Sequence, residues 1–235
     1  MKILFVIPAY NEEECILNTV NKIFNYNKKN KTRYDVLVIN DGSTDKTGEI
    51  LDKNKIPHID LIQNLGIGGA VQTGYKYAYY NNYDIAIQYD GDGQHDVEHT
   101  RKLIEPIENK KANMAIGSRF IKNKKSSFQS TGMRRLGIKI ISKLIYIKTR
   151  VKIYDVTSGF RAIDRDVMKE LIDYYPVEYP EPISLVSILY NNYKIYEVPV
   201  EMIERKTGTS SISKLKSVYY MINVIISIIL MKGKK

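Results

Sequence analysis

The sequence predicts an α/β fold in which a mainly parallel sheet is flanked by helices. Short apolar runs alternate with helical patterns along the first half of the chain, as in units that place parallel strands side by side. The first run, residues 3–7, is continuously apolar, which is typical of a strand covered on both faces. Polar loops follow four of the runs directly, at residues 8–12, 41–45, 64–68 and 90–95. Because ligands bind outside the carboxyl ends of the strands in such sheets, these loops predict a site at one edge.

Each strand of the first half is followed by a turn and a helix. Asn11 is expected to cap a helix whose apolar face includes Ile16, Val20 and Ile23. Ser43 or Thr44 would cap the next helix. Further strands are expected at residues 36–39, 60–62 and 85–88, and helices are expected to end near Lys53 and Tyr80.

The second half of the chain is less regular. Strands are expected at residues 114–117 and 193–199, and helices at 134–146, 165–174 and 181–191. The polar and basic segment 122–131 is expected to be a loop. The chain shows no internal repeat and no low-complexity linker, so we expect one catalytic domain, residues 1–211, followed by a short apolar C-terminal helix within residues 212–235.

That C-terminal segment is strongly apolar between residues 217 and 231 and ends in a basic flank. It is shorter than the roughly 20 residues that span a bilayer. An interfacial helix on an anionic surface, or a helix that contacts a small membrane-protein partner, fits this pattern. The alternative is a helix packed on the domain, and we favour the membrane or partner contact because few polar residues remain for an outer face.

Composition limits the class of protein. The 235 residues suffice for one well-packed core, and 43% hydrophobic with 26% charged residues excludes a disordered chain. The single Cys15 excludes an internal disulfide and indicates a reducing compartment. The short apolar run before Pro8 is not a secretory signal. A net charge of +10 favours a polyanionic partner, although a Lys-rich solvated surface explains it equally well.

The acidic turn Asp90-Gly91-Asp92 is the strongest candidate for chemistry. Two carboxylates separated by one small residue can both face a hard divalent cation, and glycine allows the close approach of a diphosphate. A cation there would neutralise charge on a departing nucleoside diphosphate. Asp41 can accept from a base N–H or a ribose hydroxyl, or it can organise the turn in which it lies.

The Gly-rich segment after Asn64 superficially resembles a dinucleotide-binding loop. The third glycine of that motif falls on Val71, and no acidic partner follows at the expected distance. We therefore reject a nicotinamide site. The small residues instead fit a tight helix start near a nucleotide.

Taken in order, the motifs resemble those of glycosyltransferase family 2. They are Pro8-Ala9-Tyr10-Asn11-Glu12, Asp41-Gly42-Ser43-Thr44-Asp45, Asn64-x-Gly66-x-Gly68, Asp90-Gly91-Asp92-Gly93-Gln94-His95 and Thr157-Ser158-Gly159-Phe160-Arg161. The pattern is most similar to the dolichyl-phosphate-mannose-synthase-like branch and covers nearly the whole chain. The resemblance implies the GT-A fold and inverting transfer from a nucleotide-diphosphate sugar to a lipid-linked or polysaccharide-precursor acceptor, in cell-surface glycan synthesis. It also implies a cytoplasmic enzyme, peripheral at the inner face of the cell membrane.

The resemblance implies a role for each matching position. Mg²⁺ or Mn²⁺ would be held by Asp90, Asp92 and Gln94. Arg161 and Arg205 resemble the basic groups that hold phosphates, for which a guanidinium has suitable geometry. Gln94 and His95 would shape the acceptor side, and Asp92, Arg161 and Glu181 would be the catalytic group. The donor would contact Pro8, Ala9, Tyr10, Glu12, Asp41, Asn64, Gly68, Asp90, Gly91 and Arg205.

The general base is assigned to Glu181, which lies in a stiff Pro-Glu-Pro segment. Transfer to a sugar hydroxyl needs such a carboxylate, whereas an anionic lipid phosphate can react without one. Glu181 could equally serve as an acidic residue in the first turn of its helix.

Two other classes of protein are compatible with parts of the sequence. A nucleotidyltransferase of similar fold would carry a basic Gly-rich loop after the first strand, but residues 8–12 are acidic there. A non-catalytic basic module for membranes or nucleic acid would account for the charge. Basic and aromatic residues do not alternate on a sheet face, so no nucleic-acid partner is expected.

Overall fold

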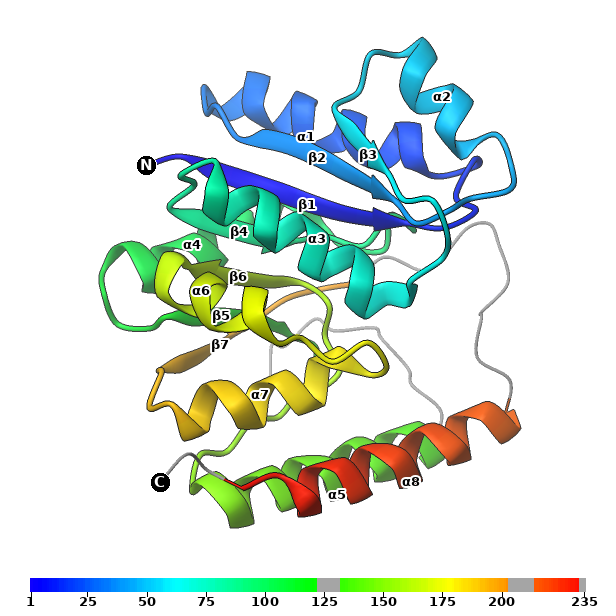
Figure 1. Cartoon of the computed structure of the whole chain (residues 1–235). Helices are drawn as coiled ribbons and strands as arrows, with labels where there is room; N and C mark the ends of the chain where they lie inside the picture. Colours follow the sequence, from blue (N-terminus) through cyan, green and yellow to red (C-terminus); the bar gives the residue numbers. More distant parts are fainter. Residues whose placement is uncertain (122–131, 203–213, 233–235) are drawn as a thin grey trace.

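A seven-stranded sheet forms the centre of the molecule (Figure 1). The computed structural model describes residues 1–121, 132–202 and 214–232. The strands lie in the order β3-β2-β1-β4-β6-β5-β7. Their bounds are Ile3–Ala9 (β1), Asp35–Asn40 (β2), His58–Asp60 (β3), Ile85–Gln88 (β4), Met114–Ser118 (β5), Arg161–Asp164 (β6) and Ile195–Pro199 (β7). Among these strands only β6 runs antiparallel to its neighbours, which confirms the predicted α/β fold with a mainly parallel sheet.

Helices cover both faces of the sheet, because the strands bury apolar side chains on both sides. On β1, Leu4 and Val6 point to the face covered by α3, α6 and α7, whereas Phe5 and Ile7 point to the face covered by α1, α2 and α4. The helix bounds are Ile16–Asn30 (α1), Thr47–Lys53 (α2), Gly66–Tyr80 (α3), Thr100–Glu108 (α4), Gly132–Thr149 (α5), Arg165–Asp173 (α6), Pro180–Tyr190 (α7) and Lys214–Leu230 (α8).

The last two long helices, α5 and α8, form an outer layer that packs on α7 (Figure 1). They run parallel, since Gly137 lies against Met221 near their amino ends and the Lys148 Nζ donates to the Met231 carbonyl 2.8 Å away near their carboxyl ends. Within the described ranges, every helix is too short or too polar to cross a bilayer.

Two elements were not predicted, and one strand was misplaced. Residues 161–164 form β6, and a helix, α4, contains Pro106 in its interior. The third strand was expected at residues 60–62 but spans His58–Asp60. The Ile62 side chain is fully exposed there, so its apolar character did not indicate burial.

The predicted helix caps were wrong. Asn11 has a positive φ of 54°, and its side-chain oxygen accepts from the Thr44 backbone N–H at 2.8 Å, so it ties two loops together instead of starting α1. The Ser43 hydroxyl accepts from the Asn11 N–H at 3.0 Å. Neither Ser43 nor Thr44 caps α2, because Asp45 accepts from the Thr47 N–H at 2.9 Å. These polar residues join neighbouring loops at the carboxyl edge of the sheet.

Candidate active site

Four loops meet at one edge of the sheet, as predicted from their positions after β1, β2, β3 and β4. The Asp41 N–H donates to the Ala9 carbonyl at 2.8 Å, which joins the loops after β2 and β1. The Asp41 carboxylate accepts from the Leu65 N–H at 2.7 Å, which joins them to the loop after β3. A Cβ on Gly91 would lie 3.0 Å from the Pro8 carbonyl and 3.7 Å from the Glu12 Cγ, so the acidic turn after β4 lies against the first loop.

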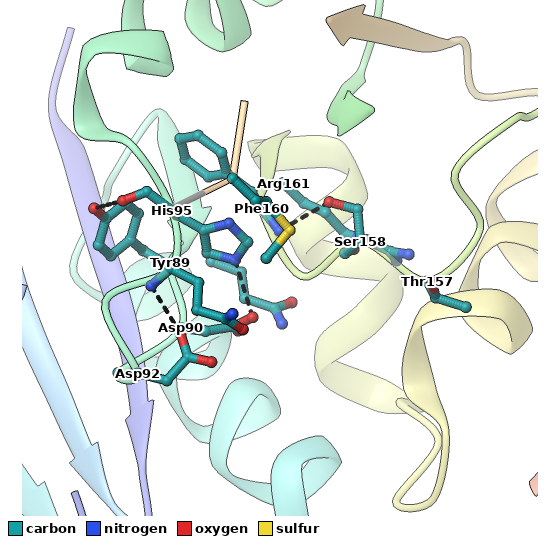
Figure 2. Close-up of polar contacts among 12 residues, drawn as sticks. Tyr89, Asp90, Asp92, His95, Thr157, Ser158, Phe160 and Arg161 are labelled. Atoms are coloured by element: carbon teal, nitrogen blue, oxygen red, sulfur yellow. Dashed lines mark hydrogen bonds and ion pairs between the residues drawn. The ribbon is translucent and has the colours of Figure 1, made fainter. Parts of the chain in front are cut away.

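Asp90, at the start of the acidic turn, is fixed by a histidine and a glycine. The His95 Nε2 lies 2.9 Å from the Asp90 Oδ2 (Figure 2). A Cβ on Gly159 would lie 2.6 Å and 2.7 Å from the two Asp90 carboxylate oxygens, so only glycine fits beside them. Burial alone raises the pKa of Asp90, but the hydrogen bond with His95 and the nearby Arg119 charge lower it, and the net effect is a pKa below its ordinary value. Asp90 is therefore an ionised, oriented carboxylate.

His95 orients Asp90 and does not face the acceptor side. Its side chain is only 3% exposed and stacks on Phe160 with ring centroids 5.0 Å apart (Figure 2). Its carbonyl accepts from the Tyr89 hydroxyl at 2.6 Å, and Tyr89 packs edge-on against Phe160. The predicted acceptor contact of His95 does not fit this burial, whereas a hydrogen bond that orients the Asp90 carboxylate does.

The rest of the acidic turn is held by α1. The Asp92 Oδ1 accepts from the Gln94 N–H at 3.0 Å, which closes a tight turn at Gly93, whose φ is +71°. The Thr19 hydroxyl donates to the Gly91 carbonyl at 2.9 Å, and the Lys22 Nζ donates to the Gly93 carbonyl at 2.8 Å. These contacts fix the conformation of the short loop that carries Asp90, Asp92 and Gln94.

The acidic turn fits a divalent cation that is shared with a ligand. Within the described residues, no group of three or more His, Cys, Asp or Glu side chains is arranged to hold a metal by itself. Asp90 and Asp92 supply two carboxylates, and the Asp90 side chain is 33% exposed because Gly159 beside it has no side chain. Mg²⁺ is commonly held by one or two carboxylates together with substrate phosphates and water. The donor set therefore suits a metal that arrives with a diphosphate.

Glu181 lies in the first turn of α7, and its surroundings place it near the Asp90 carboxylate. Burial raises the pKa of Glu181, the charge of Asp90 raises it further, and the charge of Arg161 lowers it. Gln88, the last residue of β4, is fully buried, and its amide lowers the pKa of both Glu181 and Asp90. The site thus holds one carboxyl group with a lowered pKa and one with a raised pKa, as acid–base pairs do.

Arg161 is placed differently from the predicted phosphate contact. Its side chain is 1% exposed, and its guanidinium donates to the carbonyls of Ser158 at 2.6 Å and Glu181 at 3.1 Å and to the Ser184 hydroxyl at 3.3 Å. A direct phosphate contact does not fit, because these buried donors are already used. Arg161 instead connects β6, the loop before it and the start of α7, and so positions Glu181.

The predicted donor residues of the first three loops lie at the carboxyl edge of the sheet and differ in exposure. Tyr10 is 48% exposed, whereas Ala9 and Asp41 are each 3% exposed. Burial raises the pKa of Asp41, although the backbone N–H groups of the next loop lower it. The Asn64 side chain donates to the Asp41 carbonyl at 3.2 Å. Tyr10 and Asn64 are thus exposed, whereas Asp41 is buried and, together with Asn64, organises the loop.

Gly68 serves a packing role in this structure. A Cβ at this position would lie 2.1 Å from the Pro176 carbonyl and 2.5 Å from the Val177 carbonyl. Glycine therefore lets the segment before α7 approach the amino end of α3. The remaining predicted phosphate contact, Arg205, lies outside the described residues, as does the basic segment 122–131.

A buried ion pair next to the site was not predicted. Arg119, which follows β5, binds both oxygens of Asp155 at 2.7 Å, and the two side chains are almost fully buried. The same guanidinium donates to the Thr157 hydroxyl at 2.9 Å, and its charge lowers the pKa of Asp90. In the sequence, the indication of this ion pair is an arginine that directly follows an apolar strand.

Comparison with known proteins agrees with this geometry. Residues 4–172 match the family model described as glycosyl transferase family 2. A UDP-N-acetylglucosamine–dolichyl-phosphate N-acetylglucosaminyltransferase of Methanococcus voltae is 33% identical over 86% of this chain and 85% of its own. A polyprenol monophosphomannose synthase of Mycolicibacterium smegmatis is 30% identical over 89% of this chain and 80% of its own.

The fold is also shared with a solved structure. The glucosyl-3-phosphoglycerate synthase of Mycobacterium tuberculosis, crystallised with Mn²⁺, uridine-diphosphate-glucose and phosphoglyceric acid, superposes with a TM-score of 0.72. The match covers 97% of this chain and 78% of that one at 18% identity, so it concerns the fold. Because the family model spans most of the chain and the archaeal relative is similar along nearly its whole length, the chain belongs to glycosyl transferase family 2.

Proposed function

We propose that this family 2 enzyme transfers a sugar from a nucleoside-diphosphate donor to the phosphate of a polyprenol-type lipid. The observation that carries the proposal is the Asp90 carboxylate, fixed by His95 and Gly159 at the carboxyl edge of the sheet, with Glu181 beside it. The relatives support the acceptor class, since one is named as a transferase to dolichyl phosphate and the other as a synthase of polyprenol monophosphomannose. A saccharide precursor is the second acceptor class, and cell-surface glycan synthesis fits either one.

The reaction would be a single displacement at the anomeric carbon. An acceptor oxygen forms a bond to the sugar C1, the bond from C1 to the donor phosphate oxygen breaks, and the nucleoside diphosphate leaves with the electron pair. The configuration at C1 is inverted, and the transition state is oxocarbenium-like. The products are the glycosylated acceptor and a nucleoside diphosphate.

The residues of the acidic turn would hold Mg²⁺ or Mn²⁺ together with the donor diphosphate. We assign Asp90, Asp92 and Gln94 to this cation, which when bound neutralises charge on the leaving group. Asp92 would be the more direct ligand of the cation, and His95 would keep Asp90 oriented. Tyr10, Glu12 and the loop organised by Asp41 would face the nucleoside.

Glu181 would act on the acceptor side. A phosphate monoester keeps one proton below about pH 6, and a sugar hydroxyl keeps its proton at every working pH. A carboxylate near either acceptor can take up that proton during transfer. The raised pKa of Glu181 suits this exchange, because a base with a pKa near the working pH transfers protons most efficiently. Arg161 would position Glu181 through its hydrogen bond to the Glu181 carbonyl.

Donor binding can be tested with nucleotides alone. UDP, GDP and dTDP are titrated calorimetrically into the protein with Mn²⁺, with Mg²⁺ and with EDTA. We expect one of the nucleotides to bind with metal and to lose most of its affinity with EDTA or in Asp92→Ala. Asp52→Ala, which removes an exposed carboxylate from α2, is the matched control and should bind as the wild type does. Binding that is indifferent to EDTA would contradict the metal assignment.

Acceptor class can be tested with the matching nucleotide sugar. Radiolabelled donor is incubated with undecaprenyl phosphate in detergent, with undecaprenol and with soluble oligosaccharides. We expect label in the organic phase only with the lipid phosphate. Transfer to an oligosaccharide instead would support the second acceptor class, and no transfer to any of them would overturn the proposal. Peripheral association with the cytoplasmic face of the cell membrane is the location that fits a lipid acceptor.

A further inference from the structure

The outer layer formed by α5 and α8 carries an exposed apolar surface. We call it the apolar strip, and it consists of Leu136, Ile140 and Ile147 on α5 and Ile222, Ile226 and Ile229 on α8. The exposed fractions of these side chains lie between 45% for Ile140 and 56% for Leu136. Single exposed apolar residues are ordinary, but six on two adjacent helices mark an interaction surface.

The six residues form one continuous surface because of helix geometry. On each helix they are spaced by three, four or seven residues and therefore lie on one face. Gly137, the residue after Leu136, lies against Met221 of α8. Leu136 is therefore on the part of the exposed face of α5 that is near α8. Because the helices run parallel, the two outward faces lie side by side along their length. The opposite faces carry Ile141, Ile145, Val224 and Ile228, which are fully buried and anchor the layer to the domain.

The charge around the apolar strip has one sign. On the outer flank of α5, away from α8, Arg135, Lys139, Lys143 and Arg150 are exposed. Neither helix contains an Asp or Glu anywhere in its sequence. An apolar face with a basic flank is complementary to a surface that is apolar inside and anionic outside, which describes a bilayer with anionic headgroups.

We propose that α5 and α8 together form a docking face that lies on an anionic lipid bilayer, with the apolar strip in the acyl boundary and the basic flank among the headgroups. The helices would lie in the plane of the membrane, in agreement with their length and composition. Docking on a bilayer is a property separate from sugar transfer, and vesicle binding can be measured whether or not the protein transfers a sugar. It extends the predicted interfacial role of the C-terminal segment to α5, which supplies half of the apolar strip and the whole basic flank.

Co-sedimentation with vesicles tests the docking face. Wild-type protein is mixed with vesicles of phosphatidylcholine alone and of phosphatidylcholine with phosphatidylglycerol, at low and at high salt. We expect binding to the anionic vesicles that weakens with salt. In Ile222→Gln/Ile226→Gln, vesicle partition should fall by roughly tenfold or more, because two apolar anchors are lost. Ile62→Gln replaces an exposed isoleucine after β3, outside the apolar strip, and should bind as the wild type does.

The basic flank is tested separately. Lys139→Glu/Lys143→Glu should lower binding to anionic vesicles by about tenfold or more. Lys76→Glu/Lys111→Glu makes the same change in net charge at exposed positions on α3 and after α4, and should have a much smaller effect. Failure of the wild type to bind anionic vesicles would overturn the proposal. A stable dimer in sedimentation velocity that dissociates in Ile222→Gln/Ile226→Gln would also overturn it, because the apolar strip would then be an interface between two copies of the chain.

Discussion

At Asp90, two neighbours decide how the carboxylate is presented. His95 binds one oxygen, and Gly159 contributes no Cβ at a position where it would lie within 3 Å of both oxygens. The His95 nitrogen lies 2.9 Å from the carboxylate, and even one methyl group at Gly159 would come closer than that, so small changes at either position should matter. A carboxylate that is already oriented and ionised loses little entropy when a cation binds, which is the physical advantage of fixing it in advance.

The first prediction concerns Gly159→Ala. The new methyl group would lie 2.6 Å from an Asp90 oxygen, so the carboxylate must move. We expect kcat/KM to fall by roughly 100-fold or more, since small displacements of catalytic groups have effects of this size. Metal-dependent nucleotide affinity, measured by calorimetry, should fall with it. Gly48→Ala on α2 is the control, because its methyl group would meet only the end of a side chain at 3.2 Å, and activity should persist.

The second prediction concerns the pH dependence set by Glu181. Burial holds its folded-state pKa above the ordinary value of 4.5, so the carboxylate form, which acts as the base, is lost as pH falls through that raised pKa. The acidic limb of kcat/KM should therefore lie above pH 4.5, and in Glu181→Gln it should change to the one set by protonation of the acceptor phosphate itself, at about pH 6. We expect kcat of this variant to be at least about 100-fold lower than that of the wild type. Glu181→Asp serves as the partial rescue. An unchanged acidic limb in Glu181→Gln would exclude Glu181 as the base.

The raised pKa of Glu181 suits catalysis but lowers the stability of the fold at neutral pH. A carboxyl group whose folded pKa is raised binds its proton more tightly in the folded state, so the free energy of unfolding decreases as pH rises from the unfolded to the folded pKa. At neutral pH the ionised Glu181 destabilises the fold. Glu181→Gln should accordingly raise the Tm at pH 7, and the difference should shrink as pH is lowered.

The sequence predicts which loops form the site, but it does not predict which of their side chains are buried. Asp90, Asp92 and Asp41 follow apolar strands, so their common edge was foreseeable from strand order. The burial of His95 and Arg161 was not, because each is decided by residues distant in sequence, such as Phe160 and Ser184. A polar residue in a motif can face a ligand or support one that does, and sequence spacing does not separate the two.

Among the elements, β6 is the one that changes the shape of the site. It inserts antiparallel between β4 and β5 and brings the preceding loop, residues 154–160, against the acidic turn. A four-residue strand that begins with an arginine and ends with an aspartate has no clear apolar run, which explains why it was not predicted. The fold class was predicted correctly although β6 was not, because the fold class depends on the longer β1 and β2 and on the helices between the strands.

The third prediction is that the loop before β6 is held by the ion pair of Arg119 and Asp155. Asp155→Ala leaves a buried guanidinium without its carboxylate, and we expect a loss of about 3–5 kcal/mol in the free energy of unfolding. Urea denaturation measures it. The exposed pair of Lys29 and Glu98 is the comparison, and Glu98→Ala should change stability little. Equal small effects for both variants would show that the buried pair does not fix the loop.

On the scale of the whole molecule, an aromatic contact connects the docking face to the helix that carries Glu181. Figure 1 shows α8 starting on the side toward which β1 points, where the acidic turn lies, and running beneath α7. Tyr220 of α8 packs edge-on against Tyr179, with ring centroids 4.3 Å apart. Tyr179 has a positive φ of 55° and stands two residues before Glu181. An aromatic pair therefore connects the layer of α5 and α8 to the start of α7, where Glu181 lies.

The last prediction uses this contact to separate donor binding from acceptor transfer. Tyr220→Ala removes an aromatic pair worth about 0.5–1.5 kcal/mol, so Tyr179 and the start of α7 lose one support. We expect transfer to a lipid phosphate in anionic vesicles to fall by up to about tenfold, while metal-dependent nucleotide affinity stays at the wild-type value. Tyr219→Ala is the comparison on the same helix, because Tyr219 is 61% exposed and its loss removes no buried ring. If Tyr220→Ala weakened nucleotide binding as much as transfer, α8 would support the whole domain and would not act specifically on the acceptor side. If neither changed, the two faces would work independently, and the position of Glu181 would be set by Arg161 alone.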